Sequence, residues 1–166
     1  PPALPSPAAP PPPPGGGGAP GGGGGGVWRR VRAGALNWLQ SGWHLGRFIS
    51  NVRSVSTDPV LVKRNWLDAY DYTTDKGAAV LNDYARVNDP FARIGKESVT
   101  VQITSVVRAS DTSFNVRWTE RRYVNGAAAG LERWTAVVSI VLQPPRDAER
   151  LRKNPLGIFV HAINWS

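Results

Sequence analysis

The sequence predicts an α+β fold in which three to four amphipathic helices precede a four-stranded antiparallel sheet. Apolar and polar residues alternate with period two in three runs between residues 97 and 142, the pattern of strands that bury one face. The connectors at 110–112 and 125–126 have turn composition and are too short for a parallel crossover. Between residues 38 and 94, apolar residues recur at spacings near three, four and seven, which indicates helices. A sheet with one solvent-exposed face must bury its other, apolar face against another layer, so we expect these helices to pack there.

The first 26 residues are a proline run followed by a glycine run, with no charged side chain. Such a segment cannot bury enough apolar surface to offset its ordering entropy, so we interpret it as a low-complexity linker. Two alternatives are a proline-rich ligand for an aromatic groove and a segment foreign to the native protein. Residues 27–37 are basic and poorly patterned, and we interpret them as a junction. The folded domain is expected at residues 38–166.

The first helix is expected at residues 38–56, with an apolar stripe made of Trp38, Leu45, Phe48, Ile49, Val52 and Val55. Three later helix starts share one capping signal, an Asp or Thr whose side chain can accept an amide proton of the first turn: Asp58, the stretch Thr73-Thr74-Asp75, and Asp89. Proline follows the first and last of these caps, at a position that needs no amide donor. Gly95 is expected to terminate the short fourth helix.

The alternation gives each strand an inward and an outward face. We expect apolar side chains on the inward face: Val99, Val101, Ile103, Val107, Phe114, Val116, Trp118, Trp134, Ala136, Val138, Ile140 and Leu142. We expect a mixed outward face with an apolar end: Thr100, Gln102, Thr104, Arg117, Thr119, Thr135, Val137, Val141, Phe159, Ile163 and Trp165. The fourth strand is predicted to follow a break at 143–145 and a charged helical turn within 147–153. Exposed Phe159 and Trp165 would mark a docking patch, unless the first helix or residues 143–153 cover them.

The net charge is +8, and half of it comes from four arginines with no intervening acid: Arg29, Arg30, Arg32 and Arg47. The remaining charge is dispersed along the chain, so we interpret it as solvated surface and expect no direct nucleic-acid binding. DNA binding through the basic junction is a weaker alternative, which would predict steep salt dependence.

The sequence contains no cysteine, which excludes disulfides, thiolate chemistry and Cys-ligated zinc. Its two histidines, His44 and His161, lack metal-ligand spacing, and neither a nucleophile elbow nor a phosphate-binding glycine loop occurs. We therefore expect no metal, no cofactor and no enzymatic activity. No apolar run reaches the roughly 18 residues of a membrane helix and no signal-peptide pattern is present, so the chain as written is expected to be soluble.

Two groups of residues are candidates for a site. Asn154, Pro155, Leu156 and Gly157 form a strong turn signal, because proline fixes one dihedral, glycine permits positive φ and asparagine can bond its own backbone. This turn is expected to set the approach angle of the last strand.

Glu120 and Glu132 have the inward parity and flank the predicted turn at 125–126, so they are expected on the same or adjacent rungs of the sheet. Paired carboxylates can serve as a general acid and base. Because no His, Tyr or further Asp joins them, we favour the interpretation that arginines neutralise them as a structural network.

Six groups of residues closely resemble the TrbF family of conjugal transfer proteins: Trp43-His44-Leu45-Gly46-Arg47-Phe48, Ser56-Thr57-Asp58-Pro59-Val60, Asn65-Trp66-Leu67 with Ala69-Tyr70-Asp71, Leu81-Asn82-Asp83-Tyr84, Trp118-Thr119-Glu120-Arg121-Arg122 and Asn154-Pro155-Leu156-Gly157. That family is similar to the bitopic inner-membrane assembly factors of type IV secretion systems, of which it is the conjugation branch. The resemblance spans residues 42–166 and implies the cone-shaped fold of nuclear transport factor two, with helices across a curved sheet. It also implies a periplasmic domain behind a cytoplasmic tail and one membrane helix. Residues 1–41 hold no such helix, so we interpret the front end as foreign or as a misassigned start.

The resemblance implies a non-enzymatic scaffold at the periplasmic face of a Gram-negative inner membrane. It would form a homodimer and dock other subunits of a conjugative channel, with membrane attachment only through a spanning helix. The turn at 154–157 is linked to partner contacts in similar proteins, and Trp43, Arg47, Phe159 and Trp165 are the expected dimer or docking surface. The alternative is a small-molecule enzyme or binding domain of the same cone fold that uses Glu120 and Glu132. A cone filled by Trp66, Trp118 and Trp134 would argue against that alternative.

Overall fold

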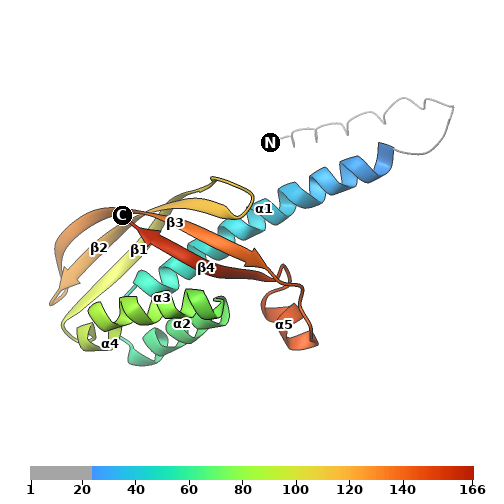
Figure 1. The fold of residues 1–166 in the computed structure, drawn as a ribbon. Helices are drawn as coiled ribbons and strands as arrows, with labels where there is room; N and C mark the ends of the chain where they lie inside the picture. The colour runs from blue at the N-terminus through green and yellow to red at the C-terminus, as the bar shows by residue number, and fades with distance from the viewer. Residues whose placement is uncertain (1–23) are drawn as a thin grey trace, which may run out of the picture.

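The computed structural model describes residues 24–166, with side chains from residue 38 onward. The elements follow in the order α1 (Gly24–Arg53), α2 (Pro59–Asp71), α3 (Asp75–Val87), α4 (Pro90–Arg93), β1 (Glu97–Arg108), β2 (Ser113–Val124), β3 (Ala127–Leu142), α5 (Ala148–Lys153) and β4 (Ile158–Trp165). Figure 1 shows α2, α3 and α4 together on one side of a curved sheet, and α5 where β3 leads into β4. The order confirms the predicted α+β fold, with helices first and the sheet after them.

The three predicted caps start α2, α3 and α4. The Asp58 carboxylate accepts a hydrogen bond from the Val60 amide at 2.9 Å, and the Asp89 carboxylate accepts one from Phe91 at 2.9 Å. The Thr74 hydroxyl accepts from the amide of Gly77 at 3.2 Å. Each cap satisfies an amide that the first helical turn leaves without a partner, which is why these helices begin where the sequence predicts.

Helix α1 begins earlier than predicted. Its backbone is helical from Gly24, so the stretch interpreted as a junction belongs to the helix, and its side chains lie outside the described residues. The predicted linker lies outside them up to residue 23. The helix ends at Arg53, because Val55 forms a bridge to Val99 with N–O distances of 3.0 and 2.9 Å. Within the described residues, no helix is both long and apolar enough to cross a membrane.

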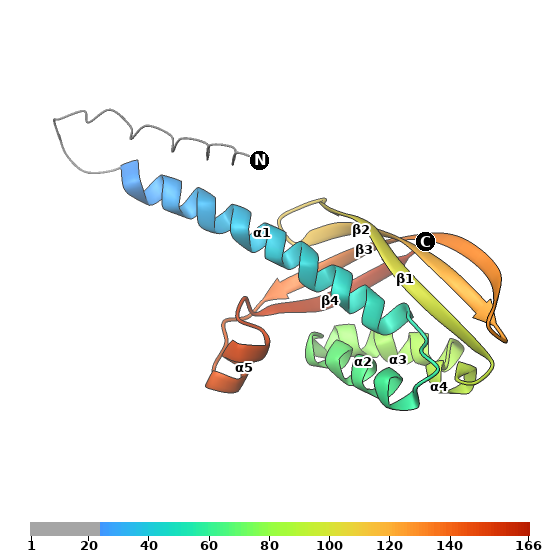
Figure 2. The same cartoon turned by 180° about the vertical axis from the view of Figure 1, so that it is seen from behind.

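The sheet is antiparallel throughout, with strand order β1-β2-β3-β4. Asn125 and Gly126 connect β2 to β3 with φ angles of 51° and 77°, as a tight two-residue hairpin requires. Figure 2 shows that α1 crosses one face of the sheet and that α2 and α3 lie on the same side. Buried apolar side chains fill the space between the layers, and they include Leu45, Trp66 and Trp118.

A bulge in β1 changes the predicted faces of that strand. Ile103 lies opposite Trp118 and Ser105 lies opposite Arg117, so Thr104 is an extra residue that shifts the alternation. Val106 packs against the core in consequence. The inward assignment of Val107 is therefore wrong, since its side chain is 55% exposed. Leu142 keeps the predicted inward parity, opposite the buried Ile158, but its side chain is exposed at the end of β3.

A second bulge exchanges the inward and outward faces of the last residues of β4. Ala162 lies opposite Ser139 and Val160 lies opposite Ile140, so His161 has no residue opposite it. Ile163 and Trp165 consequently lie opposite the inward residues Val138 and Ala136, and both pack against the core. The predicted outward placement of Ile163 and Trp165 is wrong, because simple alternation cannot register an extra residue.

Candidate docking site

The turn at 154–157 is held rigidly by its own side chains and by β3. The Asn154 side chain is buried; its Nδ2 donates to the Ile158 carbonyl at 2.8 Å and its Oδ1 accepts from the Ile158 amide at 3.1 Å. Gly157 has φ of 63°, and its carbonyl accepts from the amide of Gln143 at 2.7 Å. A Cβ on Gly157 would lie 1.8 Å from the Gln143 carbonyl oxygen, which leaves room only for glycine. The turn therefore sets the direction of β4, and Pro155 is exposed to solvent.

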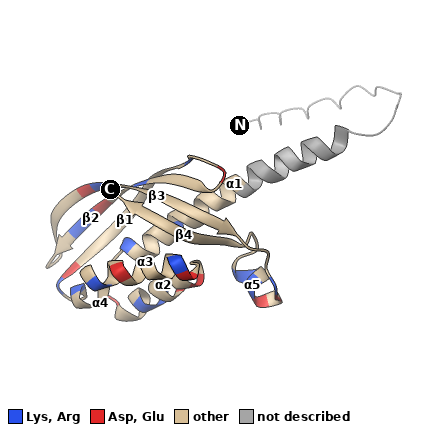
Figure 3. Ribbon diagram, viewed as in Figure 1, with Lys and Arg blue, Asp and Glu red and all other residues tan. Residues whose placement is uncertain are grey.

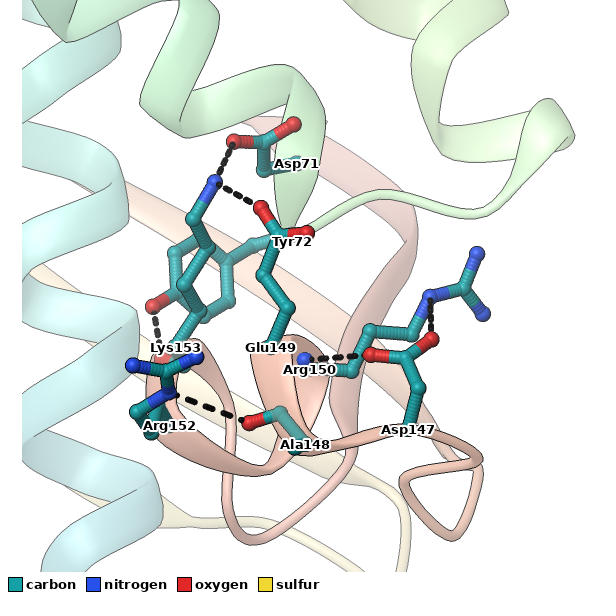
Figure 4. Close-up of polar contacts among 8 residues, drawn as sticks. All are labelled: Asp71, Tyr72, Asp147, Ala148, Glu149, Arg150, Arg152 and Lys153. Carbon is teal, nitrogen blue, oxygen red and sulfur yellow. Dashed lines mark hydrogen bonds and ion pairs between the residues drawn. The ribbon is translucent and has the colours of Figure 1, made fainter.

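Helix α5 anchors this turn to the helical layer. Asp147 caps the helix by accepting from the Arg150 amide at 2.8 Å, and its carboxylate also lies 3.7 Å from the Arg150 guanidinium. At the other end, the ammonium of Lys153 lies 3.9 Å from the Asp71 carboxylate, and the Tyr72 hydroxyl donates to the Lys153 carbonyl. Figure 4 shows these contacts between α5 and the end of α2. Exposed ion pairs each contribute at most about 1 kcal/mol, so they position the helix rather than stabilise the fold.

Trp43 and Arg47, the α1 residues of the predicted docking surface, lie near the contacts between α5 and the end of α2. Trp43 is 62% exposed, the Arg47 guanidinium lies 5.5 Å from the centroid of its ring, and His44 packs edge-on at 5.1 Å. On its other side, the His44 ring lies 5.8 Å from the ring of Tyr72. Since Tyr72 also bonds the carbonyl of Lys153, it links the α1 residues to the turn.

Burial shifts the proton affinities of both rings at this junction. It lowers the pKa of His44 below the usual 6.5, and the positive charge of Arg47 lowers it further. Burial also raises the pKa of Tyr72 above 10.0. Both groups therefore favour their neutral forms, in which two aromatic rings pack against each other without desolvating a charge.

An open groove of about 1050 Å³ runs beside the turn, between the α2–α3 connection and the segment that precedes α5. Phe159 lines it from β4, half-buried, and His161 lines it at the bulge, where its Nδ1 lies 2.9 Å from the Thr74 hydroxyl. Residues 143–147 form another wall, so this segment borders the outward apolar end of the sheet. The sequence did not predict that Tyr72 and Thr74 belong to this site. Their hydrogen-bond partners here, Lys153 and His161, lie more than 80 positions away in the chain.

Glu120 and Glu132 lie away from this groove and directly opposite each other on the same rung, as expected. The Glu120 carboxylate lies 2.5 Å from the Arg53 Nε and accepts from the Trp118 indole at 2.8 Å. Glu132 is exposed and accepts from the Trp134 indole at 3.1 Å. Glu132 has no ion pair among the residues whose side chains are described. The two carboxylates thus occupy different environments, one bound to a buried arginine and one solvated.

Four aromatic rings surround the guanidinium of Arg53, whose side chain is 9% exposed. The distances to the ring centroids are 4.2 Å for Trp134, 5.5 Å for Tyr84, 5.6 Å for Trp165 and 5.8 Å for Trp118. Arg53 was not among the predicted site residues, since a lone arginine at a helix end carries no signal of its own. This cluster occupies the end of the cone where the alternative of an acid–base enzyme would require an open pocket.

Comparison with known proteins gives consistent results. The family model for the VirB8 protein matches residues 28–166. The conjugal transfer protein TrbF of Rhizobium radiobacter is 31% identical over 125 residues, which cover 74% of this chain and 57% of that protein. The crystal structure of a TrwG component of a type IV secretion system from Bartonella birtlesii has a TM-score of 0.65 at 18% identity and covers 77% of this chain and 90% of its own. The VirB8 protein of Agrobacterium tumefaciens has a TM-score of 0.62 at 15% identity, over 74% and 86% of the two chains.

Proposed function

Because the chain belongs to the VirB8 protein family, we propose that it is a structural assembly subunit of a conjugative type IV secretion channel, acting through protein contacts. Its relative TrbF is named as a conjugal transfer protein, and the fold agrees with that of TrwG and VirB8. The chain spans 57% of the length of that TrbF relative. A periplasmic location for residues 38–166, attached to the inner membrane, is part of the same proposal.

The observation that carries this proposal is an exposed aromatic next to a rigid turn. We call it the α1–α5 surface and define it by Trp43, Arg47, Lys153 and Pro155. Tryptophan and arginine are enriched at the centres of protein interfaces, where they bury large areas at a small entropic cost. Arg47 already lies over the Trp43 ring, so the pair is partly ordered before a partner binds. The rigid turn holds the exposed Pro155 in place, and Tyr72 links this turn to the α1 residues.

The first test is self-association of the full 166-residue chain, measured by sedimentation equilibrium over a wide range of concentrations. We expect a reversible dimer that Trp43→Ala weakens by at least about tenfold, because a buried interface tryptophan is worth roughly 2 kcal/mol or more. Leu67→Ala is the matched control, since Leu67 is an apolar side chain on α2 that is 56% exposed. It should leave the dimer unchanged. A strictly monomeric chain, or equal losses in both variants, would reject the α1–α5 surface as the interface.

The alternative of a small-molecule enzyme receives less support. Trp66 and Trp118 are buried between sheet and helices, and Trp134 packs against the same core and against Arg53. The space that a substrate would need beside Glu120 is therefore occupied by side chains. A general acid must reach its substrate within hydrogen-bond distance, and this carboxylate is already bound to Arg53.

A further inference from the structure

Three arginines lie together on the outward face of the sheet. Arg117 and Arg121 lie on β2, on either side of Thr119, and Thr119 lies opposite Arg133 on β3. Diagonal neighbours on adjacent strands are about 7 to 8 Å apart, so Arg133 is within reach of both other arginines. All three are exposed, and none has an ion pair among the residues whose side chains are described. We call them the outward arginine cluster.

The acidic residues of the sheet all have the opposite orientation. β1, β2 and β3 each contain one acid, and the register gives all three the inward parity: Glu97, Glu120 and Glu132. β4 contains none. The hairpin of β2 and β3 carries both blue and red segments in Figure 3, but the two signs belong to different faces of it. The outward face is therefore uniformly basic, and a negatively charged partner would relieve the repulsion between its arginines.

Most of the side chains around the cluster are polar. On β1, the exposed Thr100 and Gln102 lie opposite Arg121 and Thr119. The apolar neighbour is Leu131, which lies opposite Arg121 and is 57% exposed. The open groove with its half-buried Phe159 lies toward the other end of the sheet, and no residue of the cluster lines it. The cluster therefore lacks the apolar centre that a protein interface buries.

The three guanidinium groups are also not held in place. Arg47 and Arg53 lie over aromatic rings, whereas no described ring holds an arginine of the cluster. Ordering such side chains against one rigid partner costs entropy. Lipid head groups move laterally, so a phosphate can move to each arginine instead. Near an anionic membrane each basic residue contributes roughly fivefold in affinity.

We propose that the outward arginine cluster binds the phosphate groups of anionic phospholipids at a membrane surface. The cluster lies on β2 and β3, the two central strands, and side chains stand perpendicular to a sheet, so strands paired beside β3 leave it accessible. Leu131 would enter the head-group region next to Arg121. Three arginines together supply roughly a hundredfold in affinity, so this contact orients the domain at a membrane rather than anchoring it. Only the choice of the inner membrane rests on the proposed function.

The first test locates the contact on the full 166-residue chain. Because the chain contains no cysteine, one introduced thiol can carry an environment-sensitive fluorophore at a single position. Gln102→Cys places it on the outward face beside the cluster, and Leu67→Cys places it on α2 as the matched control. With vesicles of phosphatidylcholine and phosphatidylglycerol, we expect a change in emission only at position 102, and less of it at high salt. No change, equal changes at both positions, or the same change with pure phosphatidylcholine would overturn the proposal.

The second test separates the cluster from the net charge. Reversing its three arginines to Glu should weaken cosedimentation with the anionic vesicles by about tenfold or more. The control makes the same change in net charge by reversing three exposed basic residues elsewhere: Lys63, Arg64 and Arg146. Equal losses in both variants would contradict the proposal, because net charge or the basic front end would then explain the binding. Thermal unfolding confirms that each variant is folded.

Competition identifies the kind of anion. We expect duplex DNA and polyglutamate, at the same concentration of negative charge, to bind the chain more weakly than the anionic vesicles and to leave the emission at position 102 unchanged. Tighter binding of DNA at this position would assign the face to nucleic acid, and tighter binding of polyglutamate would assign it to an acidic protein. Either result would overturn the proposal. Self-association through Trp43 is measured without lipid, so either proposal can fail alone.

Discussion

Two glycines with positive φ show how surroundings decide the cost of a substitution at the residue scale. Gly157 has φ of 63°, and Gly95 has φ of 82°. A Cβ on Gly95 would meet nothing within 4 Å, whereas a Cβ on Gly157 would meet the Gln143 backbone at 1.8 Å. Both positions strain an L side chain, but only Gly157 also excludes it by close contact with the backbone of Gln143, directly after β3.

We expect Gly157→Ala to lower the free energy of unfolding by about 3 kcal/mol or more, since it adds a backbone clash to the strain of positive φ. Gly95→Ala is the matched control and should cost only about 1 kcal/mol, because strain alone acts there. Urea denaturation followed by tryptophan fluorescence measures both. If the two variants lose equal stability, the contact between Gly157 and Gln143 does not constrain the turn.

At the scale of elements, the joint between α1 and the α2–α3 connection includes one pair of rings in contact, tilted by 36°. His44 projects from α1 onto Tyr72, at the end of α2, and burial lowers the pKa of His44 below 6.5. The unfolded chain therefore binds this proton more readily than the folded chain. Folding stability due to His44 is fully present above pH 6.5 and is lost as the pH falls through the lower folded pKa.

The free energy of unfolding should thus fall more steeply between about pH 7 and pH 5 in the natural chain than in His44→Gln, which has no proton to take up. Urea denaturation at several values of pH gives both slopes. Sedimentation at the same values would show whether loosening this joint also disturbs self-association through the neighbouring Trp43. Identical slopes in the two proteins would mean that His44 is not the group that responds.

Helix starts and strand positions could be predicted from the sequence, but the bulge in β4 could not. Capping by Asp58, Thr74 and Asp89 is local chemistry, so the helix starts were predictable, and alternation located the strands. The bulge at His161 was not predictable, because an extra residue is defined only against the strand it pairs with. That single residue moved Trp165 from the outward face into the core, and it changed the expected docking surface.

At the scale of the whole molecule, one buried ion pair joins the helical layer to the sheet. Arg53 is the last residue of α1, and Glu120 lies 67 positions away on β2. The rings around Arg53 come from α3, β2, β3 and β4, so these four elements and α1 meet at the pair. No sequence pattern predicts such a pair, because its members are charged residues, which are usually assigned to the protein surface.

Glu120→Gln should therefore destabilise the whole domain, by about 3 kcal/mol or more, because the charge of Arg53 stays buried without a counter-ion. Glu132→Gln is an unusually close control: it changes the same atoms on the same rung, but its carboxylate is exposed and has no ion pair among the described side chains. It should alter stability by less than about 0.5 kcal/mol. The measurements are the free energy of unfolding in urea and the near-ultraviolet circular dichroism of the tryptophans around Arg53. A large loss in Glu120→Gln alone would identify this pair as a tie between layers, whereas equal and small losses would assign the cohesion of the cone to its apolar core.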